Sequence, residues 1–353
     1  MNALDQKFAE FQELSPKDKL GCFYRNGHLF DMITSQQLNR EILEEIYTIT
    51  NHLRAKSKSQ AGALFIQGLL PHKRAMLFFA QPSSRTFLSF INACHILGMR
   101  TSEIRDPRVS SEVKGETFDD SLRTFSSYTD LIIMRHCEKN TAERAAWLLN
   151  NTNRPVPVIN GGSGSDQHPT QAILDVYTLQ RSFEHRGGLD GKTILMCGDL
   201  RRGRTVRSLS QLMTNFEGVR IIYTAPKAFQ MEDDICALLE EHKIPYIVDT
   251  ESLAKMLPEA DAIYMTRIQD EWDTPGDEST KVDTSKFKLG MAEMSKVKPH
   301  AIIMHPFPRR DEIDVAIDVD PRAMYWRQER NGMWTRAALI AYIFQVHEHI
   351  LNY

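Results

Sequence analysis

Short apolar runs alternate along the chain with stretches in which hydrophobic residues recur every three or four positions. Such runs are typical of buried parallel strands, and the stretches between them have the period of amphipathic helices. The expected strands occupy residues 75–79, 131–134, 156–159, 193–197, 220–223, 246–248, 262–265 and 301–304. Strands alternating with helices predict an α/β fold, with a closed eight-stranded barrel as the rival to open sheets.

Two strand–turn–helix units resemble each other. The helix after residues 75–79 has Ser83 or Ser84 as its cap and Gly98 as its stop. Its apolar stripe consists of Phe87, Leu88, Phe90, Ile91, Cys94 and Leu97. The helix after residues 193–197 has an apolar face made of Val206, Leu209, Leu212 and Met213. Each half of the chain thus carries a strand–turn–helix unit with Arg and Thr in the turn, which indicates two domains.

The domain boundary is expected in the polar, glycine-containing stretch 183–192. Residues 335–353 are expected to form a largely apolar helix that packs on another element, and residues 1–27 show weak periodicity and no motif. We predict an N-terminal extension over 1–27, one domain over 28–178 plus 335–353, and a second over 179–334. A chain of 353 residues is long enough for two separate cores.

Composition excludes several classes of function. The net charge of −3 gives no overall field for nucleic acid or an anionic membrane, and no apolar stretch approaches the ~18–20 residues of a membrane span. No signal-peptide core opens the sequence. Five cysteines without C-x-x-C spacing argue against a disulfide framework or a cysteine zinc site. We therefore expect a cytoplasmic protein with no nucleic-acid or membrane partner.

Polar clusters follow the carboxyl ends of six predicted strands, where open α/β sheets bind ligands. Arg, His, Ser and Thr dominate them, and the only acids in or beside them are Asp166, Asp199 and Asp311, which favours an anionic ligand. The clusters are 81–86, 135–136, 160–171, 199–205, 267–269 and 305–309.

The turn Ser83-Ser84-Arg85-Thr86 is the strongest phosphate-binding candidate. It lies where a strand leads into a helix, whose first N–H groups have no intrahelical partner and carry the positive end of the dipole. Three hydroxyls and a guanidinium add donors, and Arg grips phosphate oxygens with two parallel bonds. A simple helix cap, the alternative, accounts for one Ser but not for the whole set.

Two other motifs are weaker. The segment 198–205 nearly matches the nucleotide P-loop, but Arg204 replaces its decisive Lys, which argues against an NTPase. A glycine-rich loop carries polar side chains that resemble a site for a small planar amide or carbonyl group. These side chains are Asn160, Gln167, His168 and Gln171. A metal is not expected, because His168 has no H-x-x-x-H partner and His305 stands apart.

Taken in order, the motifs resemble the aspartate/ornithine carbamoyltransferase family from about residue 28 to the C-terminus. The turn 83–86 matches the phosphate turn, Ser110 and Lys114 the mobile loop, and 168–171 the carbonyl-reading turn. Segments 198–205 and 267–269 match the parts that hold the acceptor. The late sequence His305-Pro-Phe-Pro-Arg309 differs from the His-Cys-Leu-Pro type of ornithine-using relatives, which favours aspartate as acceptor.

The resemblance implies two doubly wound parallel-sheet domains of similar size, with the active site in the cleft between them. It also implies carbamoyl transfer from carbamoyl phosphate to L-aspartate, a step of pyrimidine synthesis, without a cofactor or metal. It implies that Arg85, Thr86, Arg135 and His168 are catalytic. The carbamoyl-phosphate side would comprise Ser83, Ser84, Arg85, Thr86, Ser110, Lys114, Arg135, His168 and Gln171. The aspartate side would comprise Lys114, Arg204, Arg267, Gln269, Phe307 and Pro308.

The resemblance also implies a homotrimer in which Ser110 and Lys114 reach a neighbouring subunit's site, and it leaves open whether a regulatory chain binds. Four positions depart from the family pattern: Gln81, Phe87, Val113 and Trp272. The two charges absent at Gln81 and Trp272 suggest that domain closure relies on substrate and on packing by Trp272. A carbamoyltransferase for another acceptor and a non-catalytic subunit are the alternative functions.

Overall fold

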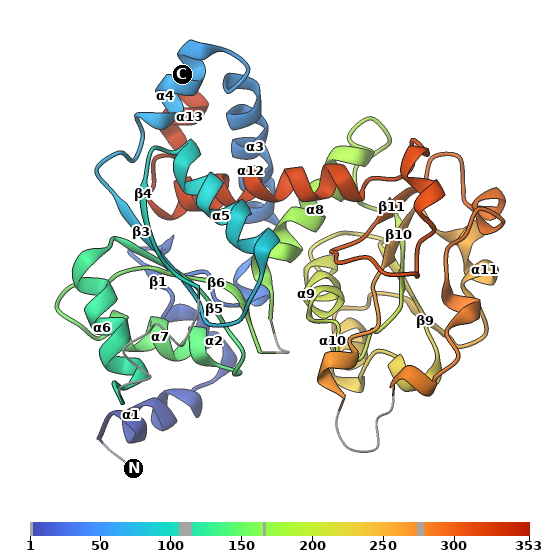
Figure 1. Ribbon diagram of the computed structural model, residues 1–353, viewed down its shortest axis with the longest axis horizontal. Coiled ribbons are helices and arrows are strands. Elements are labelled where there is room, and N and C mark those ends of the chain that lie inside the picture. Colours follow the sequence, from blue (N-terminus) through green and yellow to red (C-terminus); the bar gives the residue numbers. More distant parts are fainter. Residues whose placement is uncertain (1–2, 106–114, 165–166, 274–278) are drawn as a thin grey trace. The chain divides into compact units, whose positions relative to one another are not determined.

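The computed structural model describes residues 3–105, 115–164, 167–273 and 279–353. It forms two compact units: unit 1 is Met1–Thr170 with Gly332–Tyr353, and unit 2 is Gln171–Asn331. Each unit contains one open parallel sheet with helices packed on it (Figure 1). The predicted α/β fold with two parallel-sheet domains is therefore confirmed, and the closed barrel is wrong.

The sheet of unit 1 has four parallel strands in the order β4-β3-β5-β6. These strands are β3 (Arg74–Phe79), β4 (Arg100–Ile104), β5 (Leu131–His136) and β6 (Val158–Ser163). The chain passes from β3 to β4 on one side and then returns to β5 on the other. The strand order thus reverses between β3 and β5, and open α/β sheets bind ligands at the carboxyl side of such a switch point.

Helices pack on this sheet, and the N-terminal segment belongs to its core. The helices wholly within unit 1 are α1 (Ala3–Gln12), α2 (Pro16–Gly21), α3 (Arg40–Lys56), α4 (Gln60–Gln67), α5 (Ser84–Ile96), α6 (Phe118–Tyr128), α7 (Thr141–Asn150) and α13 (His347–Asn352). A short antiparallel pair, β1 (Tyr24–Arg25) and β2 (His28–Leu29), follows α2. Phe8 and Phe11 of α1 pack against Trp147 of α7.

The sheet of unit 2 has five parallel strands in the order β11-β10-β7-β8-β9. They are β7 (Thr193–Cys197), β8 (Arg220–Thr224), β9 (Tyr246–Asp249), β10 (Ala262–Met265) and β11 (Ile302–Met304), accompanied by α9 (Arg204–Met213), α10 (Asp233–Glu241) and α11 (Leu253–Met256). The strand order reverses between β7 and β10, which is the switch point of this sheet. The predicted apolar face of α9 is confirmed, because its four residues are all buried.

Two long helices carry the chain from one unit to the other. They are α8 (Pro169–Phe183) and α12 (Tyr325–Ile343). The predicted domain limits, at 178/179 and 334/335, fall inside these helices and stay a prediction. The single C-terminal helix expected over 335–353 is wrong, because α12 begins at Tyr325 and a break at 344–346 separates it from α13.

Three local features of unit 1 test the sequence pattern in detail. The strand β4 is absent from the predicted strands, because its side chains are mostly polar and none is fully buried. Leu88, assigned to the buried stripe of α5, is 54% exposed. Gly98 follows α5 at a φ of +81°, and a Cβ there would clash with the carbonyl of Gln67. The predicted glycine stop is therefore confirmed. Because glycine has no Cβ, the end of α4 can lie against the backbone at Gly98.

Candidate active site

The first candidate group begins at the turn between β3 and α5. Ser83 is the N-cap of α5, yet its hydroxyl makes no capping hydrogen bond, and the first turn contains no acid. Ser84 and Arg85 are exposed, and Thr86 is buried. The N–H groups of the first helical turn, the hydroxyls and the guanidinium therefore form a turn chemically suited to an anion.

Arg135 and His168 lie together over Gly162. Arg135 lies near the end of β5 with its side chain buried, and its Nη1 donates to the carbonyl of Gly161 at 3.2 Å. A Cβ built on Gly162 would lie 2.7 Å from Nη1 of Arg135 and 3.1 Å from Cδ2 of His168. Gly162 also has a φ of +109°, which L side chains rarely adopt. A glycine is therefore required where these two predicted residues meet.

Asn160 and Gln167 bond to backbone groups of their own loop and of the segment that follows β2. The Nδ2 of Asn160 donates to the carbonyl of Ile33 at 2.9 Å, and its Oδ1 accepts from the N–H of Gly162 at 2.8 Å. The Oε1 of Gln167 accepts from the N–H of Ser35 at 3.4 Å. These two amides therefore help to hold the loop, and the amide-reading role expected for them from the sequence stays a prediction.

Gln171 is buried on α8 and bonds to a residue one turn further along. Its Nε2 donates to Oδ1 of Asp175 at 3.0 Å. Burial raises the pKa of Asp175 to about 7, although hydrogen bonds from Tyr264, Gln328 and Gln171 act in the opposite direction. The sequence reasoning missed Asp175, and the available signal was its position four residues after Gln171 on a helix.

The second candidate group lies at the carboxyl ends of β7 and β10 in unit 2. Gly198, at a φ of +119°, lies so close to Thr266 that a Cβ would clash with its carbonyl. The buried carboxylate of Asp199 accepts the backbone N–H groups of Arg202 and Gln269, both at 3.1 Å. Burial raises the pKa of Asp199, and these two hydrogen bonds oppose the rise. Asp199 thus fastens the segment after β10 to the turn that precedes α9.

Several guanidinium groups of this region are paired with acids. Arg267 makes a two-pronged pair with Glu271, and the hydrogen bonds from Arg267 lower the pKa of that carboxyl. Arg202 donates to Oδ1 of Asp273 at 2.7 Å and to the carbonyl of Gln269 at 3.1 Å. The sequence reasoning missed both acids: Glu271 stands four residues after Arg267, whereas Asp273 is 71 residues from Arg202 and only the fold brings that pair together. The expectation of few acids beside these cations is therefore wrong.

The loop after β11 is fixed by a buried histidine. The backbone N–H of Phe307 donates to Nδ1 of His305 at 2.8 Å. Because Nδ1 accepts this bond, the ring proton is on Nε2. The Nε2 atom lies 2.6 Å from Oε1 of Glu312. Burial acts to raise the pKa of Glu312, but His305 and nearby backbone N–H groups together lower it. Phe307 packs its ring on Trp326. Pro308 is exposed and follows Phe307 through a cis peptide bond.

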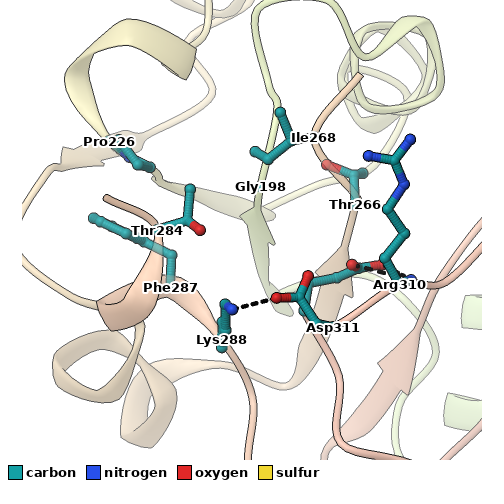
Figure 2. Close-up of a pocket in the computed structure, with 10 residues that line it drawn as sticks. Gly198, Pro226, Thr266, Ile268, Thr284, Phe287, Lys288, Arg310 and Asp311 are labelled. Carbon is teal, nitrogen blue, oxygen red and sulfur yellow. Dashed lines mark hydrogen bonds and ion pairs between the residues drawn. The ribbon is translucent and has the colours of Figure 1, made fainter. Parts of the chain in front are cut away.

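A pocket opens beside this second group, with an empty volume of about 440 Å³. Thr266 and Ile268 line it, whereas Arg267 and Gln269 are not among its lining residues. Figure 2 shows the Lys288–Asp311 ion pair at the pocket. The remaining lining residues are Gly198, Pro226, Thr284, Phe287, Arg310 and Glu312. The predicted acceptor residues therefore do not define this pocket.

Some predicted features lie outside the part of the chain that the structure describes. These are Ser110, Val113, Lys114 and Asp166, together with the side chain of Trp272.

The other two departures from the family pattern are described. Phe87 is buried against Phe79, with the guanidinium of Arg105 4.2 Å from its ring centroid. The Oε1 of Gln81 is buried and has no hydrogen-bond partner among the described residues. A phenylalanine at position 87 thus contributes to the core of unit 1.

Comparison with known families matches both units. Residues 31–181 match the carbamoyl-P binding domain of aspartate/ornithine carbamoyltransferases, and residues 190–343 match their Asp/Orn binding domain. The chain therefore belongs to the aspartate/ornithine carbamoyltransferase family. No helix within the described ranges is both long and apolar enough to cross a membrane.

Relatives from distant organisms share most of the chain. It is 37% identical to aspartate carbamoyltransferase 2, chloroplastic, of Pisum sativum, over 92% of this chain and 82% of that protein. It is also 37% identical to the aspartate carbamoyltransferase catalytic subunit of Chromobacterium violaceum, over 88% of this chain and 97% of that protein. The fold is similar to a crystal structure of aspartate transcarbamoylase from Trypanosoma cruzi in complex with carbamoyl phosphate and aspartate, with a TM-score of 0.79. The two sequences are 32% identical, and the match covers 88% of this chain and 95% of that one.

Proposed function

We propose that this chain is a catalytic aspartate carbamoyltransferase, which converts carbamoyl phosphate and L-aspartate into N-carbamoyl-L-aspartate and phosphate. The observation that carries the proposal is a pair of cationic turns, one at the switch point of each sheet, in a member of this family. The turn before α5 suits a phosphate, and the segments around α9 and β10 offer guanidinium groups to an acceptor with two carboxylates.

The phosphate is bound at the start of α5 in unit 1. The N–H groups of the first helical turn and the helix dipole attract it, and no acid in that turn opposes it. Hydroxyls and one guanidinium complete the set of donors. The side chains concerned are Ser83, Ser84, Arg85 and Thr86.

The carbamoyl group is bound beside the phosphate. Arg135 and His168, together with Thr86, polarise the carbamoyl oxygen. The shared approach of Arg135 and His168 to Gly162 supports this pairing. Gln171 orients the carbamoyl amide.

The acceptor side of the proposal rests on unit 2. Arg204, Arg267 and Gln269 take the two carboxylates of aspartate, with Phe307 and Pro308 alongside. Two guanidinium groups favour a dianionic acceptor and repel a cationic one such as ornithine. The bond from the N–H of Gln269 to Asp199 supports this grouping, because it fixes the segment that carries Gln269 against the turn before Arg204.

The reaction needs no protein nucleophile, because carbamoyl phosphate already carries a good leaving group. The deprotonated amine of aspartate attacks the carbonyl carbon and forms a C–N bond. The C–O bond to phosphate then breaks, and the proton that the amine nitrogen loses passes to the departing phosphate. Negative charge develops on the carbamoyl oxygen and on the departing phosphate, where His168, Arg135 and Arg85 stabilise it. Catalysis therefore consists of orientation and charge stabilisation.

We also propose a cytoplasmic homotrimer whose sites are completed by Ser110 and Lys114 of a neighbouring subunit. An isolated subunit is then nearly inactive, and the subunit contacts are heterologous. Mixing inactive Lys114→Ala with inactive Arg85→Ala subunits should restore a fraction of the wild-type sites. Activity that stays at the level of the separate variants after subunit exchange would contradict a shared site, and sedimentation of the mixture checks that trimers form.

The experiment that tests the function is an assay of carbamoylaspartate formation from carbamoyl phosphate and aspartate, run beside an assay of citrulline formation from ornithine. We expect the first product and no measurable second one. Citrulline alone would identify another acceptor. Neither product, from a folded trimer, would indicate a non-catalytic subunit.

A further inference from the structure

A fully buried carboxyl group on α8 lies behind the proposed carbamoyl-reading residue. Asp175 has no exposed surface, and three neutral side chains donate to it. Its Oδ1 accepts from Nε2 of Gln171 at 3.0 Å and from Nε2 of Gln328 at 2.7 Å. Its Oδ2 accepts from the hydroxyl of Tyr264 at 2.7 Å. All four residues lie in unit 2.

These contacts determine which end of the Gln171 amide faces Asp175. A carboxylate oxygen only accepts, so the amide must turn its N–H₂ group toward Oδ1. A proton on the carboxyl would occupy Oδ2, toward Tyr264, because Oδ1 already receives two N–H donors. In both protonation states Nε2 of Gln171 is therefore engaged by Asp175, and Oε1 is the end of the amide that can meet a ligand.

Asp175 also connects Gln171 to other segments of the proposed site. The hydroxyl of Tyr264 interacts with Thr205, next to Arg204 in the first turn of α9. The Oε1 of Gln328 accepts from the backbone N–H of His305 at 2.9 Å. The orientation of Gln171 is thus fixed by a buried network and not by its own helix alone.

We propose that Asp175 is a positioning residue that sets the enzyme's preference for a carbamoyl group over an acyl group. By holding Nε2 of Gln171, it presents Oε1 as an acceptor for the N–H₂ of the carbamoyl donor. A methyl group in the same position has no hydrogen to donate and leaves that buried oxygen unpaired. The inference rests on the proposed function, since it assigns Gln171 to the carbamoyl amide.

The test compares two donors with aspartate as acceptor. Acetyl phosphate replaces the N–H₂ of carbamoyl phosphate with a methyl group and would give N-acetylaspartate and phosphate. The measured quantity is the ratio of kcat/KM for carbamoyl phosphate to kcat/KM for acetyl phosphate. In Asp175→Ala, Gln171 is released and the ratio should fall by at least about tenfold. A purely structural lesion would lower both values and leave the ratio unchanged.

Two variants control this measurement. Asp175→Asn keeps an acceptor oxygen for Gln171, so its ratio should stay within about threefold of wild type. Asp31→Ala removes another fully buried carboxyl with a comparably raised pKa, in unit 1, and should leave the ratio unchanged. A ratio retained in folded Asp175→Ala, or lost equally in Asp31→Ala, would overturn the inference.

A second measurement decides the matter if Asp175→Ala does not fold. In wild-type enzyme, the side-chain N–H₂ protons of Gln171, identified by their loss in Gln171→Leu, should exchange with solvent at least about 100-fold more slowly than those of free glutamine. Exchange at the free rate would overturn the inference. The proposed function fails separately, through absence of carbamoylaspartate formation by the wild-type enzyme.

Discussion

The start of α5 and the start of α9 have the same sequence pattern, but the structure holds them differently. Each follows a strand at a switch point, carries Arg then Thr, and has no acid in its first turn. At the start of α5, the Ser83 hydroxyl makes no capping hydrogen bond, and Ser84, the first residue of the helix, is exposed. Before α9, Asp199 and Arg202 tie the turn to the segment 269–273.

The difference reflects the two ligands that we propose. A phosphate is bound largely by backbone N–H groups and the helix dipole, which any exposed helix start supplies. Two carboxylates at a fixed separation require guanidinium groups at a fixed separation, and neighbouring cations repel each other. Acids such as Glu271 and Asp273 offset that repulsion and orient the cations. The turn before α9, here called the braced turn, therefore depends on acids from other segments of unit 2 to orient its cations.

The largest effect is expected at the carbamoyl side. In the mechanism that we propose, His168→Ala removes one preorganised donor to the carbamoyl oxygen, so kcat should fall by about 10²–10³ while the fold is retained. Steady-state kinetics and circular dichroism measure the two quantities. His72→Ala, an exposed histidine of the same unit, serves as the control and should behave like wild type. Near wild-type turnover in His168→Ala would remove His168 from the mechanism.

A smaller and more selective effect is expected at the braced turn. Asp199→Asn replaces one acceptor oxygen by N–H₂, which faces the donors of Arg202 or Gln269. An unpaired buried donor costs about 1–3 kcal/mol, so the KM for aspartate should rise by about tenfold. The KM for carbamoyl phosphate should change by less than about twofold. Asp314→Asn, at the cap of another segment, is the control, and a rise confined to carbamoyl phosphate would contradict the comparison.

The smallest effect on activity is expected from Asp31, a buried carboxyl of unit 1 that no described contact joins to a proposed site residue. Burial raises its pKa to about 7, and bonds from Asn150 and Val158 offset this only in part. Its folded-state pKa exceeds the unfolded value, so its stabilising contribution is complete below about pH 4 and is lost as pH rises through 7.

Urea unfolding measures this contribution. The quantity to follow is the free energy of unfolding of wild type minus that of Asp31→Asn. This difference should decrease between about pH 4 and about pH 7, by at most about 1.4 kcal/mol per pH unit. Above about pH 7 it should level off. A difference that is constant or increases with pH would show that the carboxyl is not held in the way described.

The elements that could be predicted from the sequence are those in which successive residues are all buried. The strand β7 matches its prediction to the residue, since an unbroken apolar run must be buried on both faces. The strand β4 was missed because its side chains, such as Glu103, are largely solvent-facing. Helix α1 was missed because only a few of its residues, Phe8 and Phe11 among them, join the core.

The candidate site was predictable to a similar extent and for a similar reason. Arg85, Arg204 and Arg267 stand shortly after predicted strands, so topology alone directs them to the carboxyl edge of a sheet. Tyr264 and Gln328, which bond to Asp175, are 89 and 153 residues away from it in the chain. Only the folded chain shows that such distant residues meet.

The most direct test of the account is calorimetry with N-(phosphonacetyl)-L-aspartate, the compound present in one of the Trypanosoma cruzi structures. If the two turns bind the two ends of one ligand, wild type should bind one molecule per chain at least about 100-fold more tightly than phosphate or aspartate alone. Arg85→Ala and Arg204→Ala should each weaken binding by at least about tenfold. No binding, or an affinity insensitive to either substitution, would contradict the account.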